Sequence, residues 1–217
     1  MDYLKGHFPT SLAVVESNNT WVPSGDGFKF EHAVGVVNIA RLTGETTLLP
    51  MALLVCCRWC KRAVEGFTYS DGERETLSTK DLGVCFTAQA KLLRTTILAY
   101  FSTYQPLPKG ICKAKDGGAA CQRALLALSD VAAREAQGVI QPNPMVLVDC
   151  DLPKDAPRLC MNCKMGIRVR QLVRKKKCWS LLPSMMGISV SQWSEESDDQ
   201  DSESSEEEDR GLQCPIQ

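Results

Sequence analysis

The chain has 217 residues, of which 44% are hydrophobic and eleven are cysteines. This length suits one domain with a tail, or two very small domains, and the apolar fraction is sufficient for a packed core. The cysteines are too sparse for a small secreted scaffold held by disulfides, so we expect a reducing compartment, cytoplasmic or nuclear. The longest apolar stretch, residues 48–57, is too short to cross a bilayer, which predicts a protein without a transmembrane segment.

The formal net charge of −1 hides a division along the chain. Residues 194–209 contain ten acidic residues and no lysine or arginine, whereas residues 1–193 carry 24 basic and 16 acidic residues. An acidic segment without aromatic residues cannot bury enough surface to offset the entropy of ordering, so residues 194–217 are predicted to be a disordered acidic tail. Folding of this tail back onto the basic body is the alternative.

The first hundred residues predict a loop-rich start followed by helices. Residues 1–30 are punctuated by proline, asparagine and glycine, which favours loops. The apolar spacing over residues 33–42 predicts a helix that ends near Gly44. Pro50 suits the first turn of a second helix that continues to about Val64, because a proline there removes no intrahelical hydrogen bond.

A third helix is predicted over residues 79–100, with Ser78 as its N-cap and Asp81 as the acidic residue of its first turn. We expect its core face to be apolar and to consist of Leu82, Cys85, Phe86, Ala90, Leu93 and Ile97.

The remainder of the chain predicts two more helices separated by irregular segments. Residues 104–120 form a loop rich in proline and glycine, and a helix begins near Cys121 and ends at Gly138. The prolines of residues 139–157 predict irregular structure, and the last helix is expected over residues 163–179. The fold is therefore predicted to be mainly α, with about five helices, a cysteine-rich helical subdomain and the acidic tail.

Three runs of the sequence carry a resemblance to a known family. Residues 32–57 contain an Ala-Arg-Leu…Leu-Pro-x-Ala-Leu-x-x-Cys-Cys block, residues 65–82 an Asp-Gly-x-x-Glu-x-Leu-Ser turn, and residues 179–187 a Trp…Leu-Pro…Gly element. This pattern resembles the second half of the BTB/POZ-domain proteins of mushroom-forming fungi. The resemblance spans residues 8–193. The amino-terminal part of a BTB domain would precede Phe8, so the resemblance implies a partial domain.

The resemblance implies an organisation and a class of function. Residues 1–103 would be the BTB-like helical portion, residues 104–193 a cysteine-containing C-terminal subdomain, and residues 194–217 the tail. BTB-type domains dimerise and act as adaptors for cullin-based ubiquitin ligases. We therefore expect a non-catalytic protein-interaction module with protein partners, which include a second copy of the chain or a ubiquitin-ligase scaffold.

Cys160-x2-Cys163 has a metal-ligand spacing, in which two thiolates on a tight turn can face one tetrahedral ion. Cys112 and Cys121, on the Pro/Gly-rich loop, are the best candidates for the other two ligands of a structural zinc site. The resemblance supports this choice, because the family tends to place paired cysteines at both points. Cys150 and Cys178 are substitutes, and the alternative is that all these cysteines are small buried hydrophobes.

Two further groups of residues have functional alternatives. Residues 168–177 contain six basic residues in ten, which suits either a nuclear protein that associates with nucleic acid or a solvated helix face. We favour the solvated face, because no aromatic residues are interleaved for base stacking. Pairing of Cys56, Cys57 or Cys60 with His32 would give a thiol–imidazole pair, but no third orienting group is evident. We therefore expect no enzyme activity and no catalytic residues.

Overall fold

The computed structural model describes residues 2–18, 29–108, 110–138, 159–191 and 193. Its elements, in chain order, are α1 (Asp2–His7), α2 (Leu12–Asn18), the 3-10 turn η1 (Phe30–His32), α3 (Ala33–Thr43), the 3-10 turn η2 (Thr46–Leu48), α4 (Leu49–Arg58), α5 (Cys60–Glu65), β1 (Phe67–Thr68), β2 (Arg74–Glu75), α6 (Thr79–Thr103), α7 (Ala119–Gly138) and α8 (Met161–Met185). The mainly helical fold is thus confirmed. The two strands, which were not predicted, form a short antiparallel hairpin.

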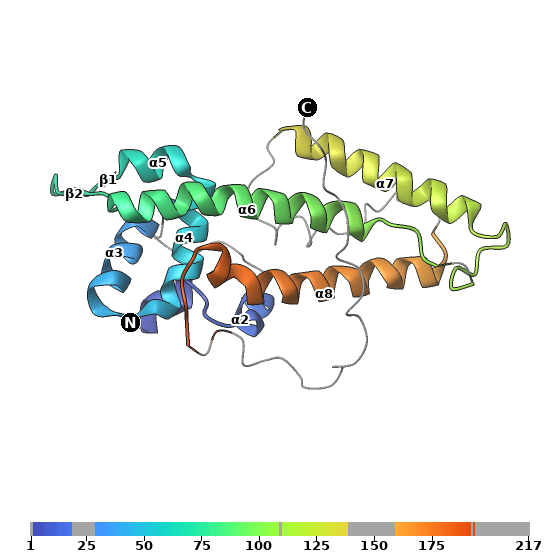
Figure 1. Ribbon diagram of the computed structural model, residues 1–217, viewed down its shortest axis with the longest axis horizontal. Helices are drawn as coiled ribbons and strands as arrows, with labels where there is room; N and C mark the ends of the chain where they lie inside the picture. Colours follow the sequence, from blue (N-terminus) through green and yellow to red (C-terminus); the bar gives the residue numbers. More distant parts are fainter. Residues whose placement is uncertain (1, 19–28, 109, 139–158, 192, 194–217) are drawn as a thin grey trace, which may run out of the picture.

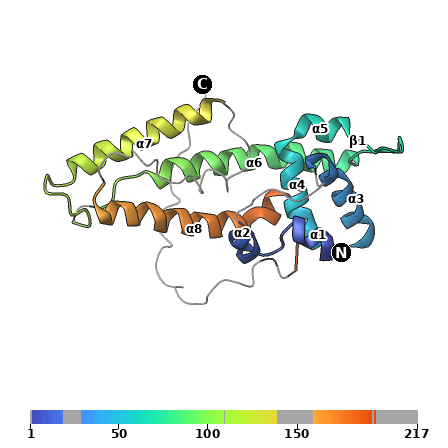
Figure 2. The same cartoon turned by 180° about the vertical axis from the view of Figure 1, so that it is seen from behind.

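The molecule is elongated, and two long helices extend along it (Figure 1). α6 and α8 lie side by side, and the short helices α1 to α5 gather at one end of this pair. α7 lies along the other half of α6, and the view from behind shows the same arrangement (Figure 2). None of the described helices is long and apolar enough to span a bilayer.

The short helices enclose the larger hydrophobic core, which we call the proximal core. It contains Phe8 and buried side chains of α2 to α6, together with those of the carboxyl-terminal half of α8, including Cys178, Trp179, Leu182 and Met185. α4 lies at its centre, because every residue from Leu49 to Cys57 is buried. The α3 helix ends as predicted at Gly44, whose φ of 75° turns the chain toward α4.

Two expectations for the first hundred residues are wrong. The start of the chain forms two short helices, Asp2–His7 and Leu12–Asn18, where loops were expected, and Phe8 between them is completely buried in the proximal core. The predicted helix from Pro50 to Val64 is divided at Trp59, whose φ and ψ of −117° and 41° are not helical. The Trp59 ring stacks on Phe30 with the centroids 4.9 Å apart, a tertiary contact that periodicity alone does not reveal.

The core face of α6 is also different from the predicted one. Cys85 is buried as expected, but Phe86, Ala90 and Ile97 are exposed. The buried residues of α6 are Asp81, Cys85, Ala88, Leu92, Thr96, Ala99, Tyr100 and Thr103. α6 therefore has two apolar faces, and the helix buries the one with small residues, which permit close packing against α4 and α8.

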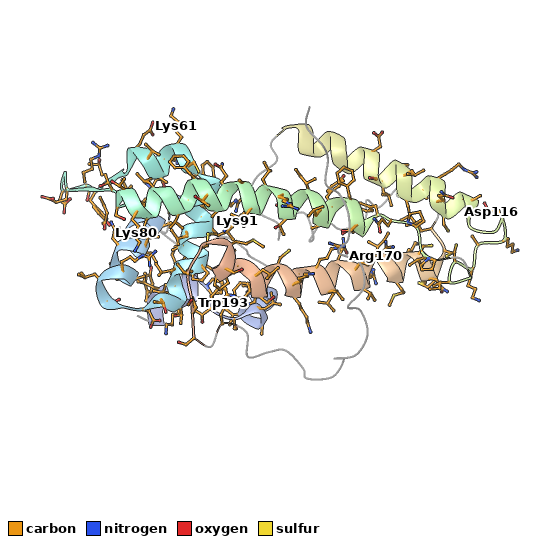
Figure 3. The ribbon with its side chains drawn as sticks, viewed as in Figure 1. Lys61, Lys80, Lys91, Asp116, Arg170 and Trp193 are labelled. Carbon is orange, nitrogen blue, oxygen red and sulfur yellow. The ribbon has the colours of Figure 1, made fainter. Side chains whose placement is uncertain are left out.

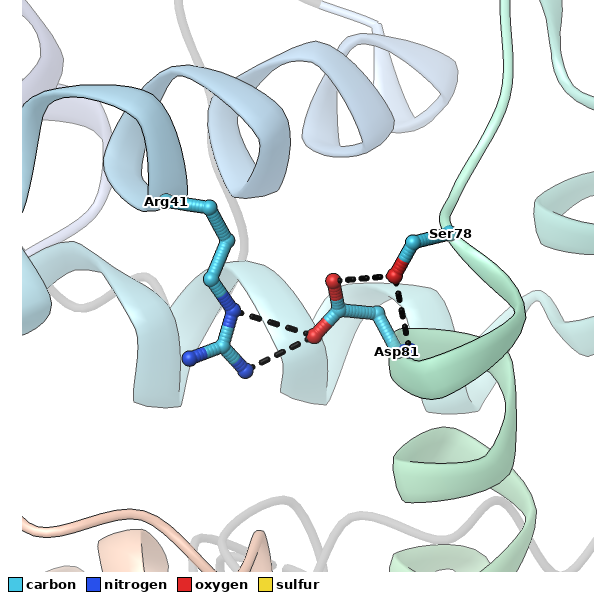
Figure 4. Close-up of polar contacts among 3 residues, drawn as sticks. All are labelled: Arg41, Ser78 and Asp81. Carbon is cyan, nitrogen blue, oxygen red and sulfur yellow. Dashed lines mark hydrogen bonds and ion pairs between the residues drawn. The ribbon is translucent and has the colours of Figure 1, made fainter.

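A buried carboxylate fixes the start of α6 (Figure 4). The Ser78 hydroxyl accepts a hydrogen bond from the Asp81 amide at 3.1 Å and donates one to the Asp81 carboxylate at 2.8 Å, so the predicted N-cap is confirmed. The other carboxylate oxygen accepts two hydrogen bonds from the Arg41 guanidinium, at 2.7 and 3.1 Å. Ser78 and Asp81 thus cap α6, and Arg41 ties this cap to α3.

A second, smaller core lies at the other end of α6 and α8, and we call it the distal core. It consists of Tyr100, Tyr104, Cys121, Ala124, Leu125, Leu128, Leu159, Cys163 and Ile167. α8 is longer than the predicted residues 163–179 and contributes to both cores. The predicted disorder of residues 194–217 and the predicted irregular segment 139–157 lie outside the described residues.

Candidate metal centre

The chain positions four cysteines at the distal end through two helix starts and one loop. Cys121 is the third residue of α7, and Cys160 is the N-cap of α8. Cys163 lies in the first turn of α8, so a helical turn brings its side chain to the same end as Cys160. Cys112 lies on the loop between α6 and α7.

The structure brings these four side chains together. All four Sγ atoms lie within 4.8 Å of one another, and the Sγ atoms of Cys112 and Cys160 are 3.7 Å apart. The latter separation is far from the roughly 2 Å of a disulfide. In a tetrahedral site with metal–sulfur bonds of about 2.3 Å, neighbouring sulfurs are about 3.8 Å apart, and the Cys112–Cys160 separation matches this distance. Cys121 and Cys163 are buried, whereas Cys112 and Cys160 are half-buried, so the cluster is enclosed on one side.

Glycines and a capping carboxylate shape the loop that carries Cys112. Gly117 and Gly118 have φ values of 69° and 96°, which L-residues other than glycine rarely adopt. A Cβ on Gly118 would stand 3.3 Å from the Cys112 sulfur, so this glycine also permits a close approach. The Asp116 carboxylate then accepts hydrogen bonds from the amides of Gly118 and Ala120 at the start of α7.

Contacts from α8 hold the same loop against the cluster. The Asn162 side-chain amide donates to the Ile111 carbonyl at 2.7 Å, one residue before Cys112. The Arg170 guanidinium donates to the carbonyls of Ser102 and Gln105 where α6 ends. Gly166 leaves room for Leu107, whose methyl group would lie 2.7 Å from a Cβ at that position. These contacts fix the relative positions of the loop and α8.

The surroundings of the cluster shift the pKa values of its thiols in opposite directions. Two helices, α7 and α8, begin at the cluster, and helix starts carry a partial positive charge that stabilises thiolates. The Cys163 amide, together with the Lys113 amide and neighbouring thiols, lowers the pKa of Cys160 to about 6. The Cys160 amide donates a hydrogen bond to the Cys121 sulfur at 3.3 Å, which by itself would lower the pKa of Cys121. Burial and neighbouring thiols have the larger opposite effect, so the pKa of Cys121 is raised overall. Burial raises the pKa of Cys163.

The other cysteines considered from the sequence are placed elsewhere. Cys178 is buried in the proximal core, so it does not substitute for a ligand, and Cys150 lies outside the described residues. Cys56, Cys57 and Cys85 are core residues between α4 and α6, where the Cys57 thiol donates to the Cys85 carbonyl at 3.4 Å.

Cys60 and His32, considered above as a thiol–imidazole pair, each make hydrogen bonds to other residues. The Cys60 thiol donates to the Cys57 carbonyl at 3.1 Å. The His32 Nδ1 accepts a hydrogen bond from the Lys29 amide at 3.2 Å, and the His32 ring packs edge-on against Phe67.

The basic stretch 168–177 lies on α8 between the two cores. Its side chains are divided. Arg170 turns toward α6 and the loop that follows it (Figure 3). Arg168, Lys176 and Lys177 are exposed. Leu172 and Val173 are about half exposed, whereas Ile167 is completely buried.

Sequence reasoning identified the four sulfur positions and missed the residues that hold them. Asn162, Arg170 and Gly166 contact residues of the loop that are more than 50 positions away in the chain, so no local sequence pattern identifies them. The Gly117-Gly118 pair directly before a helix start is the one signal in the sequence that points to a tight turn here. Comparisons with protein-family models, curated proteins and solved structures found no match to this chain.

Proposed function

We propose that the chain is a non-catalytic protein-interaction module of BTB type whose distal end is fastened by one structural zinc ion on Cys112, Cys121, Cys160 and Cys163. The observation that carries the proposal is the convergence of four sulfurs, all within 4.8 Å of one another, from a loop and two helix starts. A donor set of four thiolates is typical of structural zinc, because a catalytic zinc keeps one position open for water or substrate.

The fit of the site to zinc follows from its charge and size. Four thiolates and one divalent cation leave two negative charges, which the two helix starts stabilise. Two sulfurs on one ion cannot be more than about 4.6 Å apart, so closure of the site requires only small movements. The zinc would join the loop after α6, the start of α7 and the start of α8, and its binding energy would become folding energy of the distal core.

Zinc content tests the metal centre directly. We expect the purified chain to contain one zinc per molecule by elemental mass spectrometry, and C112S and C163S to lose it. C60S is the matched control, since Cys60 is a thiol of α5 outside the cluster. Full zinc occupancy in both cluster variants, or no metal in the wild-type chain purified without chelator, would contradict the metal centre.

The interaction role is supported by the unused apolar face of α6. Phe86 and Phe101 are 55% and 61% exposed, and Ile97 lies between them on the same side of the helix. At 100° per residue these three side chains fall within an arc of about 60°, over about 22 Å of helix. An exposed strip of this length fits the apolar face of a partner protein's amphipathic helix. The resemblance to BTB/POZ-domain proteins supports the same class of function.

Binding through this strip is tested by comparing two variants. We expect F86S/F101S to lose protein partners or self-association that the wild-type chain shows, because the strip loses its two largest side chains. L42S is the control, since Leu42 is 87% exposed on α3 and lies outside the strip. Sedimentation velocity measures self-association, and quantitative mass spectrometry of co-purified proteins measures other partners. Equal association of both variants would argue against the strip.

A further inference from the structure

α8 is unusual in its charge. It carries seven basic residues and no acidic residue over its 25 positions. Among them Lys164, Arg168 and Lys176 are exposed, and they are spaced four and eight residues apart along the helix. They therefore lie within an arc of about 120° and cover about 18 Å of the helix. We call these three residues the α8 basic strip. The ion pairs found among the described residues join other side chains and leave this strip out.

The chain that leaves α8 turns back toward this strip. Gly187, with φ of 65°, follows the helix end, and the Ile188 amide donates to the Pro183 carbonyl at 3.0 Å. Trp193 is buried: its ring stacks on Trp179 with centroids 4.5 Å apart, and its Nε1 donates to the Trp179 carbonyl at 2.8 Å. Trp179 lies six residues before the end of α8 and three residues after Lys176. The polypeptide is thus anchored at Trp193 (Figure 3), against a residue of α8 that lies about one helical turn after the last residue of the strip.

The segment that follows this anchor has the complementary charge and sufficient length. Residues 194–209 contain ten acidic residues and no basic residue. Sixteen residues can reach about 50 Å, whereas the strip begins about one turn away and extends about 18 Å. Because the segment is covalently attached beside the strip, its effective concentration there is in the millimolar range, far above that of a free anionic partner.

We propose that the acidic segment 194–209 is the occupant of the α8 basic strip and screens it from other polyanions. Individual exposed ion pairs contribute little, so the contact depends on many charges acting together and weakens with salt. The intact chain would then bind external polyanions poorly, although α8 by itself has the charge of a polyanion-binding helix. An external polyanion must therefore displace the acidic segment before it can bind this surface.

The test uses the full chain and a variant in which the ten acidic residues of 194–209 are replaced by their amides. A fluorescein-labelled peptide with the wild-type sequence of residues 194–210 is the probe, and fluorescence anisotropy measures its binding at low and high salt. We expect the neutral-tail variant to bind the peptide at least about tenfold more tightly than the intact chain, because its strip is no longer occupied. This binding should be lost at high salt.

Charge variants locate the surface. In the neutral-tail background, K164Q/R168Q/K176Q should weaken peptide binding at least about tenfold. K61Q/K80Q/K91Q removes the same number of charges from α5 and α6, and we expect less than about a twofold effect. Circular dichroism and thermal melting confirm that each variant is folded.

Three results would overturn the proposal. The first is equal peptide affinity of the intact and neutral-tail chains, and the second is an equal loss in the two triple variants. The third is tight binding of a duplex DNA oligonucleotide that is the same in the intact and neutral-tail chains, which would mean that α8 serves nucleic acid without competition from the acidic segment.

Discussion

At the scale of single residues, Asp81 shows how a local signal acquires a tertiary role. The sequence marks it as the acidic first-turn partner of the Ser78 cap, and the structure adds the ion pair with Arg41 on another helix. The Asp81 side chain is 5% exposed and that of Arg41 is 35% exposed, so solvent screens the pair only in part. This carboxylate therefore fixes both the start of α6 and its rotation relative to α3.

D81N keeps the shape of the side chain and removes its charge. We expect it to lower the free energy of unfolding by about 1–3 kcal/mol, because Arg41 loses its partner and the cap loses a carboxylate acceptor. Urea denaturation followed by circular dichroism measures the change. E73Q, at an exposed position of the hairpin turn, is the control and should unfold like the wild type. A D81N chain as stable as E73Q would show that the pair contributes nothing to stability.

At the scale of elements, α4 and α6 differ in how far their apolar pattern determines their packing. α4 is apolar around its whole circumference and is buried on every side. α6 is apolar on two faces, and only the face with Ala88 and Ala99 is buried. A helix with one possible apolar face is oriented by its sequence, whereas a helix with two is oriented by its neighbours.

L53D tests the central position of α4. Leu53 is completely buried, so an unpaired carboxylate there should cost more than about 4 kcal/mol and unfold the proximal core. We expect loss of the cooperative thermal transition in differential scanning calorimetry. L42D, at the exposed end of α3, should retain it. If L53D melts like L42D, the assignment of α4 to the core is wrong.

At the scale of the whole molecule, two hydrophobic cores lie along one pair of long helices. The proximal core contains most of the large buried side chains, whereas the distal core is small and lies beside the cysteine cluster. A small core stabilises its surroundings weakly, and this is the situation in which a structural metal contributes most to folding. The four cysteines therefore lie where the fold has the least apolar stabilisation.

Removal of the metal should destabilise the distal core and leave the stability of the proximal core nearly unchanged. We expect a strong chelator to accelerate amide hydrogen exchange over residues 100–128 and 159–170, where the distal core and the cluster lie. Exchange over residues 33–92 should remain nearly unchanged, because the proximal core contains none of the four ligands. Exchange that accelerates equally in both regions would indicate a single cooperative unit, and no change in either would argue against a metal contribution.

The sequence by itself determined the features that depend on neighbours in the chain. The helix ends at Gly44 and the cap at Ser78 follow from local backbone and side-chain hydrogen bonding, and they agree with the structure. The Cys160-x2-Cys163 turn likewise depends on local spacing, and the choice of Cys112 and Cys121 as its companions agrees with the observed cluster. Bound zinc and a BTB-type role remain predictions.

The tertiary structure decided the features that depend on contacts between distant segments. The break at Trp59, the burial of Phe8, Leu12 and Val15 near the start of the chain, and the rotation of α6 are each set by packing against elements far away in the sequence. The same holds for Asn162, Gly166 and Arg170, which hold the loop of Cys112 against α8. The physical reason is that periodicity reports which residues are apolar, whereas only close packing decides which of two apolar faces is buried and what lies against it.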